Sequence, residues 1–332
     1  MKRLIIVLFV LSFVLQCQDI FSQTNQKRDV EVFCSLNTQT CVVGEPVYLT
    51  FEFQNTTDLL VEFRTQLSLY GDVKVNLTIP RKLPVDYRGA YKPTIQAYYV
   101  FEIPPKKVER VAMTLLYSED SPDGLIFDRP MTVPISVSLE GLIDTRKVKY
   151  EFPSLQLEVK EPQASDMPAF LFLRKKSLAY DIHQSRAARE NVSAFETFLK
   201  QFPDSVYSPY VLFSIANGYS VKTQTQNPDY PRAIELFKKY IERYPNTILT
   251  DDAVYKIGDC YNSLGDKKMA KQWFIKLLND YPKSNRLNYY DPLMKEYIFI
   301  PAENQTPKEM WMLYDQSTAV DRSEPGKGEQ PM

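Results

Sequence analysis

Hydrophobic and polar residues alternate through the first half of the chain, which is the pattern of half-buried β-strands. The clearest run is 47–54 (VYLTFEFQ), which lies between turn-forming segments at 44–46 (GEP) and 55–58 (NTTD). Successive side chains of a strand point to opposite faces, so this alternation predicts one buried and one polar face. Residues 29–161 therefore predict an antiparallel β-sandwich. Further runs of this kind lie at 59–63, 73–79, 98–103, 108–117, 132–139, 147–152 and 155–159.

The beginning of this half is similar to a known type of domain. The segment 43–47 (VGEPV) leads into a strand that ends at 55–57 (NTT), and in this it resembles the immunoglobulin-like modules of exported bacterial proteins. Neither tryptophan of the chain lies in 29–161, so the buried Trp of antibody domains has no counterpart here. The resemblance implies an immunoglobulin-like architecture only, because such sandwiches carry many different functions.

Beyond a linker at 161–165 (EPQAS) the apolar period becomes that of helices, and the sequence repeats itself. Residues 211–219 (VLFSIANGY) align with 253–261 (AVYKIGDCY). In the same way, 233–245 (AIELFKKYIERYP) aligns with 270–282 (AKQWFIKLLNDYP). Two aligned pairs in a fixed order indicate that the same helix pair is built more than once.

Each unit ends in an aromatic residue followed by proline, which stops a helix because it lacks the amide donor and clashes with the preceding turn. Ala216 and Gly258 are small where the two helices of a pair must approach closely. These features predict about three stacked helix pairs over 166–285, the first of them a partial copy that ends at 195–203. The three closing pairs are Phe202-Pro203, Tyr244-Pro245 and Tyr281-Pro282.

With these residues the segment resembles the tetratricopeptide repeat, a unit of about 34 residues. If Gly258 is the eighth residue of a unit, then Ala270, Phe274 and Pro282 fall at positions that the family prefers, while Leu277 stands where a small residue is usual. The sequence is most similar to periplasmic repeat proteins of outer-membrane assembly and of the Tol-Pal envelope system. The resemblance implies an adaptor that binds an envelope protein or peptide along a concave groove.

The same resemblance assigns eight side chains of the inner helices to this groove. In an alternative interpretation the sandwich is the binding module, of a protease-inhibitor-like or a ligand- or carbohydrate-binding kind, and the helices are its mount. The predicted partner-binding residues are Tyr180, His183, Phe213, Asn217, Ser220, Tyr255, Asp259 and Asn262.

Residues 1–22 are typical of an export signal. A basic start precedes the apolar run 4–15, which is shorter than the ~20 residues that a membrane-spanning helix needs. Cleavage after Ser22 predicts a mature chain in the periplasm or outer envelope, without a transmembrane segment. A lipid anchor on Cys17 is the second possibility, although the preceding Gln16 is unusual for a lipoprotein signal.

The composition excludes several kinds of function. Lys and Arg number 40 against 41 Asp and Glu, so the bulk charge gives no reason to expect nucleic-acid binding. The chain has one histidine, His183, which excludes a zinc site with several histidines, and no motif of a catalytic or phosphate-binding loop occurs. Asp251 and Asp252 are interpreted as charges favourable to a helix start. We therefore expect no enzyme activity, no metal and no cofactor.

The cysteines and the C-terminal extension give three further predictions. Cys34 and Cys41 flank a polar stretch that suits a turn, and in an oxidising compartment they predict a disulfide, with two unpaired thiols as the alternative. Cys260 lies among helical apolar positions and is expected in the core. Residues 286–332 predict an extension with one short helix at 307–318 and a disordered tail.

Overall fold

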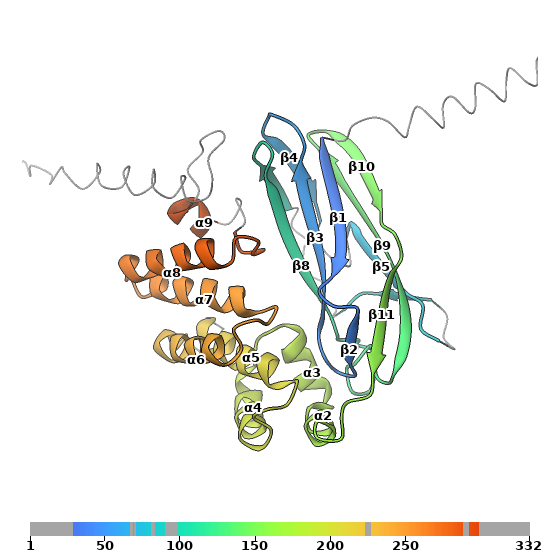
Figure 1. Cartoon of the computed structure of the whole chain (residues 1–332), viewed down its shortest axis with the longest axis vertical. Helices are drawn as coiled ribbons and strands as arrows, with labels where there is room; N and C mark the ends of the chain where they lie inside the picture. Colours follow the sequence, from blue (N-terminus) through green and yellow to red (C-terminus); the bar gives the residue numbers. More distant parts are fainter. Residues whose placement is uncertain are drawn as a thin grey trace, which may run out of the picture.

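The computed structural model describes residues 29–66, 69, 71–80, 84–89, 99–222, 227–287 and 292–298. Strands come first and helices follow, in the order that the two periodicities predict (Figure 1). The strands are β1 (Val30–Leu36), β2 (Thr40–Val42), β3 (Val47–Asn55), β4 (Val61–Thr65), β5 (Val73–Leu77), β6 (Val85–Tyr87), β7 (Tyr99–Ile103), β8 (Val108–Leu115), β9 (Met131–Ile143), β10 (Arg146–Glu151) and β11 (Leu155–Lys160).

The helices begin directly after the last strand. None of those within the described ranges has both the length and the apolar character that crossing a membrane requires. The expected export signal and the expected helix at 307–318 lie outside the described residues. The helices are α2 (Met167–Leu173), α3 (Lys176–His183), α4 (Arg189–Gln201), α5 (Ser208–Ser220), α6 (Tyr230–Arg243), α7 (Thr250–Ser263), α8 (Lys267–Asp280) and α9 (Pro292–Tyr297).

Two sheets make up the N-terminal part, called the β-domain below. One has the order β1-β3-β8, and the other is built on β2-β11-β9-β4-β7, with β5 and β10 also paired to β9 and β6 paired to β5. The strand pairs are antiparallel except for β2 and β11, which run parallel. The structure thus has a β-sheet domain in the expected place. The unequal, mixed sheets do not establish the immunoglobulin-like topology that the sequence suggested.

The core of the β-domain follows from the alternation in β3. Phe51 and Phe53 are fully buried, whereas Thr50 and Glu52 face outward and are partly exposed. The ring centroid of Phe53 lies 5.0 Å from that of Phe63 in β4, which belongs to the other sheet. Each buried ring of this size contributes about 1.5–3 kcal/mol, so the contacts between the two sheets hold them face to face.

The helices do not form a separate body. One cluster of buried apolar residues runs from Val30 in β1 to Cys260 in α7, so the β-domain and the helical array share a core. The helices lie beside the β-domain in Figure 1, and the predicted linker at 161–165 is a short connection into α2. The burial of Cys260 agrees with its predicted place in the core.

The structure does not contain the predicted disulfide, since Cys34 and Cys41 are both free thiols. Cys34 lies in β1 and pairs with Phe51 of the three-stranded sheet, whereas Cys41 lies in β2 and pairs with Val159 of the other sheet. The polar stretch between them is a crossing from one sheet to the other and not a closed hairpin. Burial raises the pKa of each thiol to about 12.

Candidate protein-binding surface

Two helix pairs, α5 with α6 and α7 with α8, carry the repeated sequence. A Cβ atom on Gly258 would lie 2.6 Å from Cε1 of Phe274, so only glycine lets α7 approach α8 this closely. Ala216, at the same place in α5, is fully buried. The small residues therefore have the role that the sequence predicted, at the contact between the two helices of a pair.

Two of the predicted groove residues lie inside the array. Phe213 is 2% exposed, and its ring centroid lies 5.4 Å from that of Phe237. Tyr255 is 7% exposed, with Phe274 at 5.8 Å and the guanidinium of Arg286 over its ring at 5.5 Å. A partner cannot reach them without opening the array. The assignment of Phe213 and Tyr255 to partner binding is therefore corrected, because both rings fill space between helices.

The predicted groove residues of α5 are partly exposed and bonded within the chain. Asn217 donates from Nδ2 to the backbone carbonyl of Ser185, which follows α3, at 2.8 Å. The hydroxyl of Ser220 donates to the side-chain oxygen of Asn217 at 3.0 Å. These side chains tie α5 to the preceding helix pair, and their predicted contact with a partner stays a prediction.

The predicted groove residues of α7 are also bonded to neighbours. Asp259 forms an ion pair with Lys256 at 3.7 Å. The side-chain oxygen of Asn262 accepts hydrogen bonds from Nζ of Lys267 at 2.6 Å and from the hydroxyl of Tyr297 in α9 at 2.7 Å. Asn262 thus joins α7 to both α8 and α9, which gives it a structural role.

The β-domain covers the near end of the predicted groove. The ring of Tyr117, which follows β8, lies 5.2 Å from Tyr180 and 5.9 Å from His183, measured between centroids. A Cβ atom on Gly89 would come within 3.4 Å of Nε2 of His183. Tyr180 and His183 are partly exposed and contact the β-domain, and their predicted contact with a partner stays a prediction.

His183 is held as a neutral ring at this contact. Its Nδ1 is buried and has no hydrogen-bond partner among the described residues. Burial lowers the pKa of His183 to about 4, because the protonated ring would be a cation with little access to water. The chain's one histidine therefore acts as a packing residue between α3 and the β-domain.

A second contact joins the turn between β2 and β3 to α5. The hydroxyl of Tyr207 donates to the carbonyl of Val43 at 2.6 Å, and that of Tyr210 donates to Oε1 of Glu45 at 3.0 Å. Burial raises the pKa of Glu45, and the hydrogen bonds from the backbone N–H of Val42 and from Tyr210 act in the opposite direction. The turn that the sequence placed before the first clear strand is thus a docking point for the helices.

Tyr48 shows that the array also covers the outer face of β3. By the alternation of that strand its side chain points away from the core of the β-domain, yet it is 5% exposed. Burial raises the pKa of Tyr48, and Asp252 and Tyr240 of the array lie close enough to add to the shift. The inner side of the helical array therefore faces the chain's own sheet.

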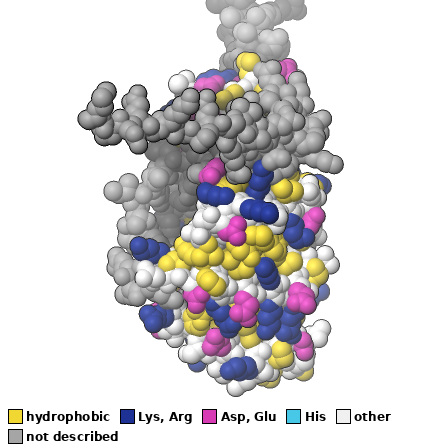
Figure 2. Space-filling view, turned by 90° about the vertical axis from the view of Figure 1, so that its left-hand side faces the viewer, with side chains coloured by type: hydrophobic (Ala, Val, Ile, Leu, Met, Phe, Trp, Pro, Cys, Tyr) yellow, Lys and Arg dark blue, Asp and Glu magenta, His cyan; other side chains and the backbone are white. Residues whose placement is uncertain are grey.

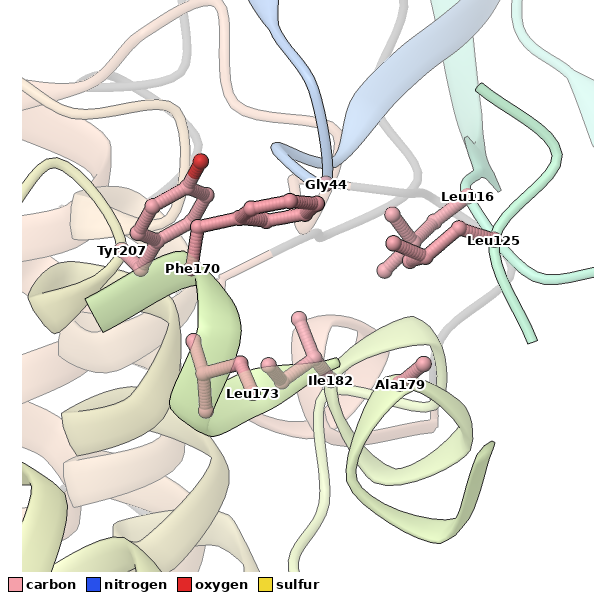
Figure 3. A pocket seen from close by; sticks show the side chains of 8 residues that line it. All are labelled: Gly44, Leu116, Leu125, Phe170, Leu173, Ala179, Ile182 and Tyr207. Atoms are coloured by element: carbon pink, nitrogen blue, oxygen red, sulfur yellow. The ribbon is translucent and has the colours of Figure 1, made fainter. Parts of the chain in front are cut away.

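Figure 3 shows the joint from close by, where side chains from both parts surround a small apolar cavity. Its volume is about 10 Å³, close to the least that holds one water molecule. The joint is nearly filled, which leaves no room for a ligand. The residues around the cavity are Gly44, Leu116 and Leu125 from the β-domain and Phe170, Leu173, Ala179, Ile182 and Tyr207 from the helical part.

Asp251 and Asp252 occupy the first turn of α7, as the sequence suggested. Asp252 is ion-paired with Arg286. Burial raises the pKa of Asp251 to about 6, and the neighbouring Asp252 adds to the shift, while Ser284 lowers it. Two carboxylates stand beside one cation, so the repulsion between them lowers the stability of the folded protein at neutral pH.

The exposed side of the array carries a different group of residues, which we call the aromatic surface: Lys238, Tyr261, Leu264 and Trp273. The ammonium of Lys238 lies 5.6 Å from the ring centroid of Tyr261 and 5.8 Å from that of Trp273. Tyr261 and Trp273 are partly exposed, and Leu264 is 48% exposed. Figure 2 shows the face at the left of Figure 1, where hydrophobic side chains gather among charged ones.

Among the described residues, no group of three or more His, Cys, Asp or Glu side chains is placed to hold a metal ion. The acidic turn at 119–123 is bonded to the end of α2 and the start of α3: Asp123 is ion-paired with Arg174, and Glu119 with Lys176.

Comparison with known proteins supports the repeat assignment. Residues 223–247 and 252–284 match the tetratricopeptide repeat family. These segments hold α6, α7 and α8, and their repeats point to protein–protein interaction. No curated protein sequence matches the chain.

Three similar solved structures, each at 13% identity, are distant likenesses. A β-glucosidase from Listeria innocua in complex with isofagomine has a TM-score of 0.22, over 40% of this chain and 16% of that one. The DNA glycosylase AlkC from Pseudomonas fluorescens, bound to DNA with an abasic site analogue, has 0.21, over 40% and 30%. The sporulation control protein Spo0M from Bacillus subtilis has 0.22, over 43% and 54%. Each match spans less than two thirds of the other chain, and scores this low carry no functional argument.

The aromatic surface was not predicted from the sequence, where Tyr261 and Trp273 stand only within the aligned segments 253–261 and 270–282. One signal was available, since the residue aligned with Trp273 in the preceding unit is Leu236, which is 7% exposed. A large aromatic residue that replaces an aliphatic one in a single repeat marks a local difference between the two units.

Proposed function

We propose that this protein is an exported, non-catalytic adaptor that binds another envelope protein or peptide through its helical array. The observation that carries the proposal is the match of 223–247 and 252–284 to the tetratricopeptide repeat. Stacked helix pairs suit this task because they present side chains at fixed spacing on a rigid support. The β-domain would hold the array in one orientation, since the two parts share a core.

The aromatic surface is the favoured site for the partner. The originally expected groove is occupied at Tyr180 and His183 by Tyr117 of the β-domain. By contrast, Leu264 and Trp273 on α7 and α8 remain accessible. Partly exposed aromatic residues are enriched in protein interfaces because they offer a large contact area at little cost in side-chain entropy.

Site-specific photo-crosslinking in the cell tests this proposal on the full chain. Benzoylphenylalanine replaces Leu264, which is 48% exposed at the turn between α7 and α8. The matched control replaces Leu59, which is 74% exposed between β3 and β4 in the β-domain. We expect a protein partner to be captured from position 264 and not from position 59.

A second candidate function makes the β-domain the binding module, and the exposed pair Leu59 and Leu60 favours it. These side chains are 74% and 56% exposed at one turn of the β-domain. Capture from position 59 alone would support this alternative and reject the helical array as the binding site. Removing the helices is a poor test, because the shared core would be cut.

Export and the absence of catalysis belong to the same proposal. Mass spectrometry of the protein from the cell envelope should find a mature chain that begins after Ser22. A mature chain that begins at a lipid-modified Cys17 would instead indicate a membrane-anchored protein. Support for a non-catalytic role comes from His183, whose ring is packed against Tyr117. Turnover in a broad hydrolase screen of the purified protein would contradict it.

A further inference from the structure

Lys238 is the central residue of the aromatic surface. Its Nζ donates a hydrogen bond to the hydroxyl of Tyr261 at 3.1 Å and lies over the rings of Tyr261 and Trp273. A cation over an aromatic ring is attracted by the negative face of the ring. Contacts from two helices therefore hold this ammonium in one place. Its binding to a partner then costs less side-chain entropy than the binding of a flexible lysine.

The charge of Lys238 is not compensated. It has no ion pair with a carboxylate among the described residues, although it is exposed. Other cations of the same helices are paired in the ordinary way, Arg232 with Glu235 at 2.7 Å and Lys276 with Asp280 at 2.5 Å. A fixed, unpaired cation beside accessible aromatic rings is suited to a carboxylate that comes from another molecule.

The two helices that supply Lys238 and Trp273 are both basic. The segment of α6 (YPRAIELFKKYIER) has four basic and two acidic residues, and that of α8 (KKMAKQWFIKLLND) has four lysines and one aspartate. The whole chain has a net charge of −1, so the excess is local. Lys268 adds an exposed cation in the first turn of α8, where the helix dipole disfavours positive charge.

Comparison of the repeats shows that the fold does not require this arrangement. One repeat earlier along the chain, the residue aligned with Lys238 is Glu196 on α4, and the one aligned with Trp273 is Leu236 on α6. That unit keeps the tyrosine, Tyr219, without a lysine over it among the described contacts. The combination of cation and indole therefore occurs where α6 meets the last helix pair and is not repeated one unit earlier.

We propose that the aromatic surface binds an acidic polypeptide segment, with a carboxylate on Lys238 and apolar side chains on Trp273 and Leu264. This inference rests on the proposed adaptor function and names the class of its partner. A polypeptide is favoured over a nucleic acid because 252–284 matches a protein-interaction repeat. Charge attraction would speed association and set the choice of partner, while contact with the rings supplies the apolar burial.

Trp273 supplies the signal for a direct test, since the only other tryptophan is Trp311. In a Trp311→Phe background, emission of Trp273 is titrated with a blocked synthetic peptide of the repeat Glu-Glu-Leu-Ser. The comparison probes are the same peptide with Lys in place of Glu, and a single-stranded DNA oligonucleotide. We expect a saturable change with the acidic peptide only, and a weaker one at high salt, where the attraction is screened.

Variants at neighbouring lysines locate the site. Lys238→Glu should weaken binding of the acidic peptide about tenfold or more, which corresponds to about 1.4 kcal/mol, whereas Lys238→Arg should bind nearly as well as the parent. Lys239→Glu is the matched control, because Lys239 is exposed on the same helix and should lose much less. Melting temperatures of the variants check that each is folded.

Three results would overturn the inference: no response to the acidic peptide, an equal response to either comparison probe, or equal losses in Lys238→Glu and Lys239→Glu. Crosslinking from position 264 to residues 299–332 of the same chain would also overturn it. If position 264 crosslinks to a neutral or basic segment of a partner protein, the adaptor function is supported and only the acidic class of partner is rejected. Failure of both capture and peptide binding would reject both.

Discussion

The hydroxyl of Tyr210 in α5 donates a 3.0 Å hydrogen bond to Oε1 of Glu45, which lies in the turn between β2 and β3. The other oxygen of the same carboxylate accepts the backbone N–H of Val42 at 3.1 Å. One side chain of the β-domain is thus bonded both to its own turn and to the helical array. The bond crosses the joint through which the two parts share their core.

Tyr210→Phe should lower the free energy of unfolding by about 1–2 kcal/mol, because it leaves a largely buried carboxylate with one donor fewer. Urea unfolding in the Trp311→Phe background, followed by Trp273 fluorescence and by circular dichroism, checks this. Both signals should shift together, since the helices and strands share a core. Tyr230→Phe is the control, as the structure describes no hydrogen bond of that hydroxyl. Two separate transitions would contradict the shared core.

Gly258→Ala should destabilise the protein by about 1–3 kcal/mol, although alanine is the better helix former by up to about 1 kcal/mol. The added Cβ would meet the ring of Phe274 at 2.6 Å, and that ring is fully buried and cannot move aside. Thermal melting measures the loss. Gly265→Asn serves as the control: Gly265 has a φ of +81° and open space around it, and asparagine tolerates that conformation. A neutral Gly258→Ala would show that the helix pair packs more loosely than described.

Because of His183, the stability of the protein should decrease as the pH decreases. Its folded pKa of about 4 lies below the ordinary 6.5, so the unfolded chain binds the proton more tightly. The stabilisation is complete above pH 6.5 and is lost as the pH falls toward 4. A depression of this size corresponds to up to about 3 kcal/mol.

His183→Phe keeps a ring beside Tyr117 and removes the titration. The difference in unfolding free energy between the parent and this variant should change across pH 6.5 to 4 and stay constant above pH 7. Urea titrations at a series of pH values measure it. Parallel pH profiles of the two proteins would mean that the ring is hydrated and not buried as described.

Asp251 should act in the opposite direction. Its folded pKa of about 6 lies above the ordinary 3.8, so its contribution is most favourable below pH 3.8 and is lost as the pH rises through 6. Asp251→Asn should therefore stabilise the protein at pH 8 by about 1–3 kcal/mol, with a gain that vanishes near pH 4.

The adjacent Asp252 is the matched comparison. Asp252→Asn should destabilise the protein at pH 8, because it leaves Arg286 without its ion-pair partner. Substitutions of the same kind at neighbouring positions would thus have opposite signs. Equal effects of both would indicate that the two carboxylates share the guanidinium of Arg286.

The repeat and its helix pairs could be predicted because their signals are local. Gly258 and Phe274 stand in one aligned unit, and the packing between α7 and α8 depends on residues close in sequence. Most of the longer strands followed from alternation, as in β3, but the seven-residue β1 was not among the predicted runs. Short β2 and β6, of three residues each, were missed because a run that short has no measurable period.

The candidate site was harder to predict, because accessibility depends on which distant parts of the chain come together. Tyr180 and His183 have the right register for an inner surface, but Tyr117 from the β-domain lies against them. Cys34 and Cys41 are near neighbours in sequence and belong to different sheets. Neither fact leaves a trace in the local pattern.

By itself, the sequence determined which segments become strands and which become paired helices, because periodicity and small residues act over one or two turns of chain. Only the tertiary structure decided which helix faces stay open to a partner. It placed the β-domain over Tyr180 and His183 and left Lys238 and Trp273 at the exposed side. The physical reason is that burial is set by long-range packing, which determines both the pKa of a side chain and its access to a partner.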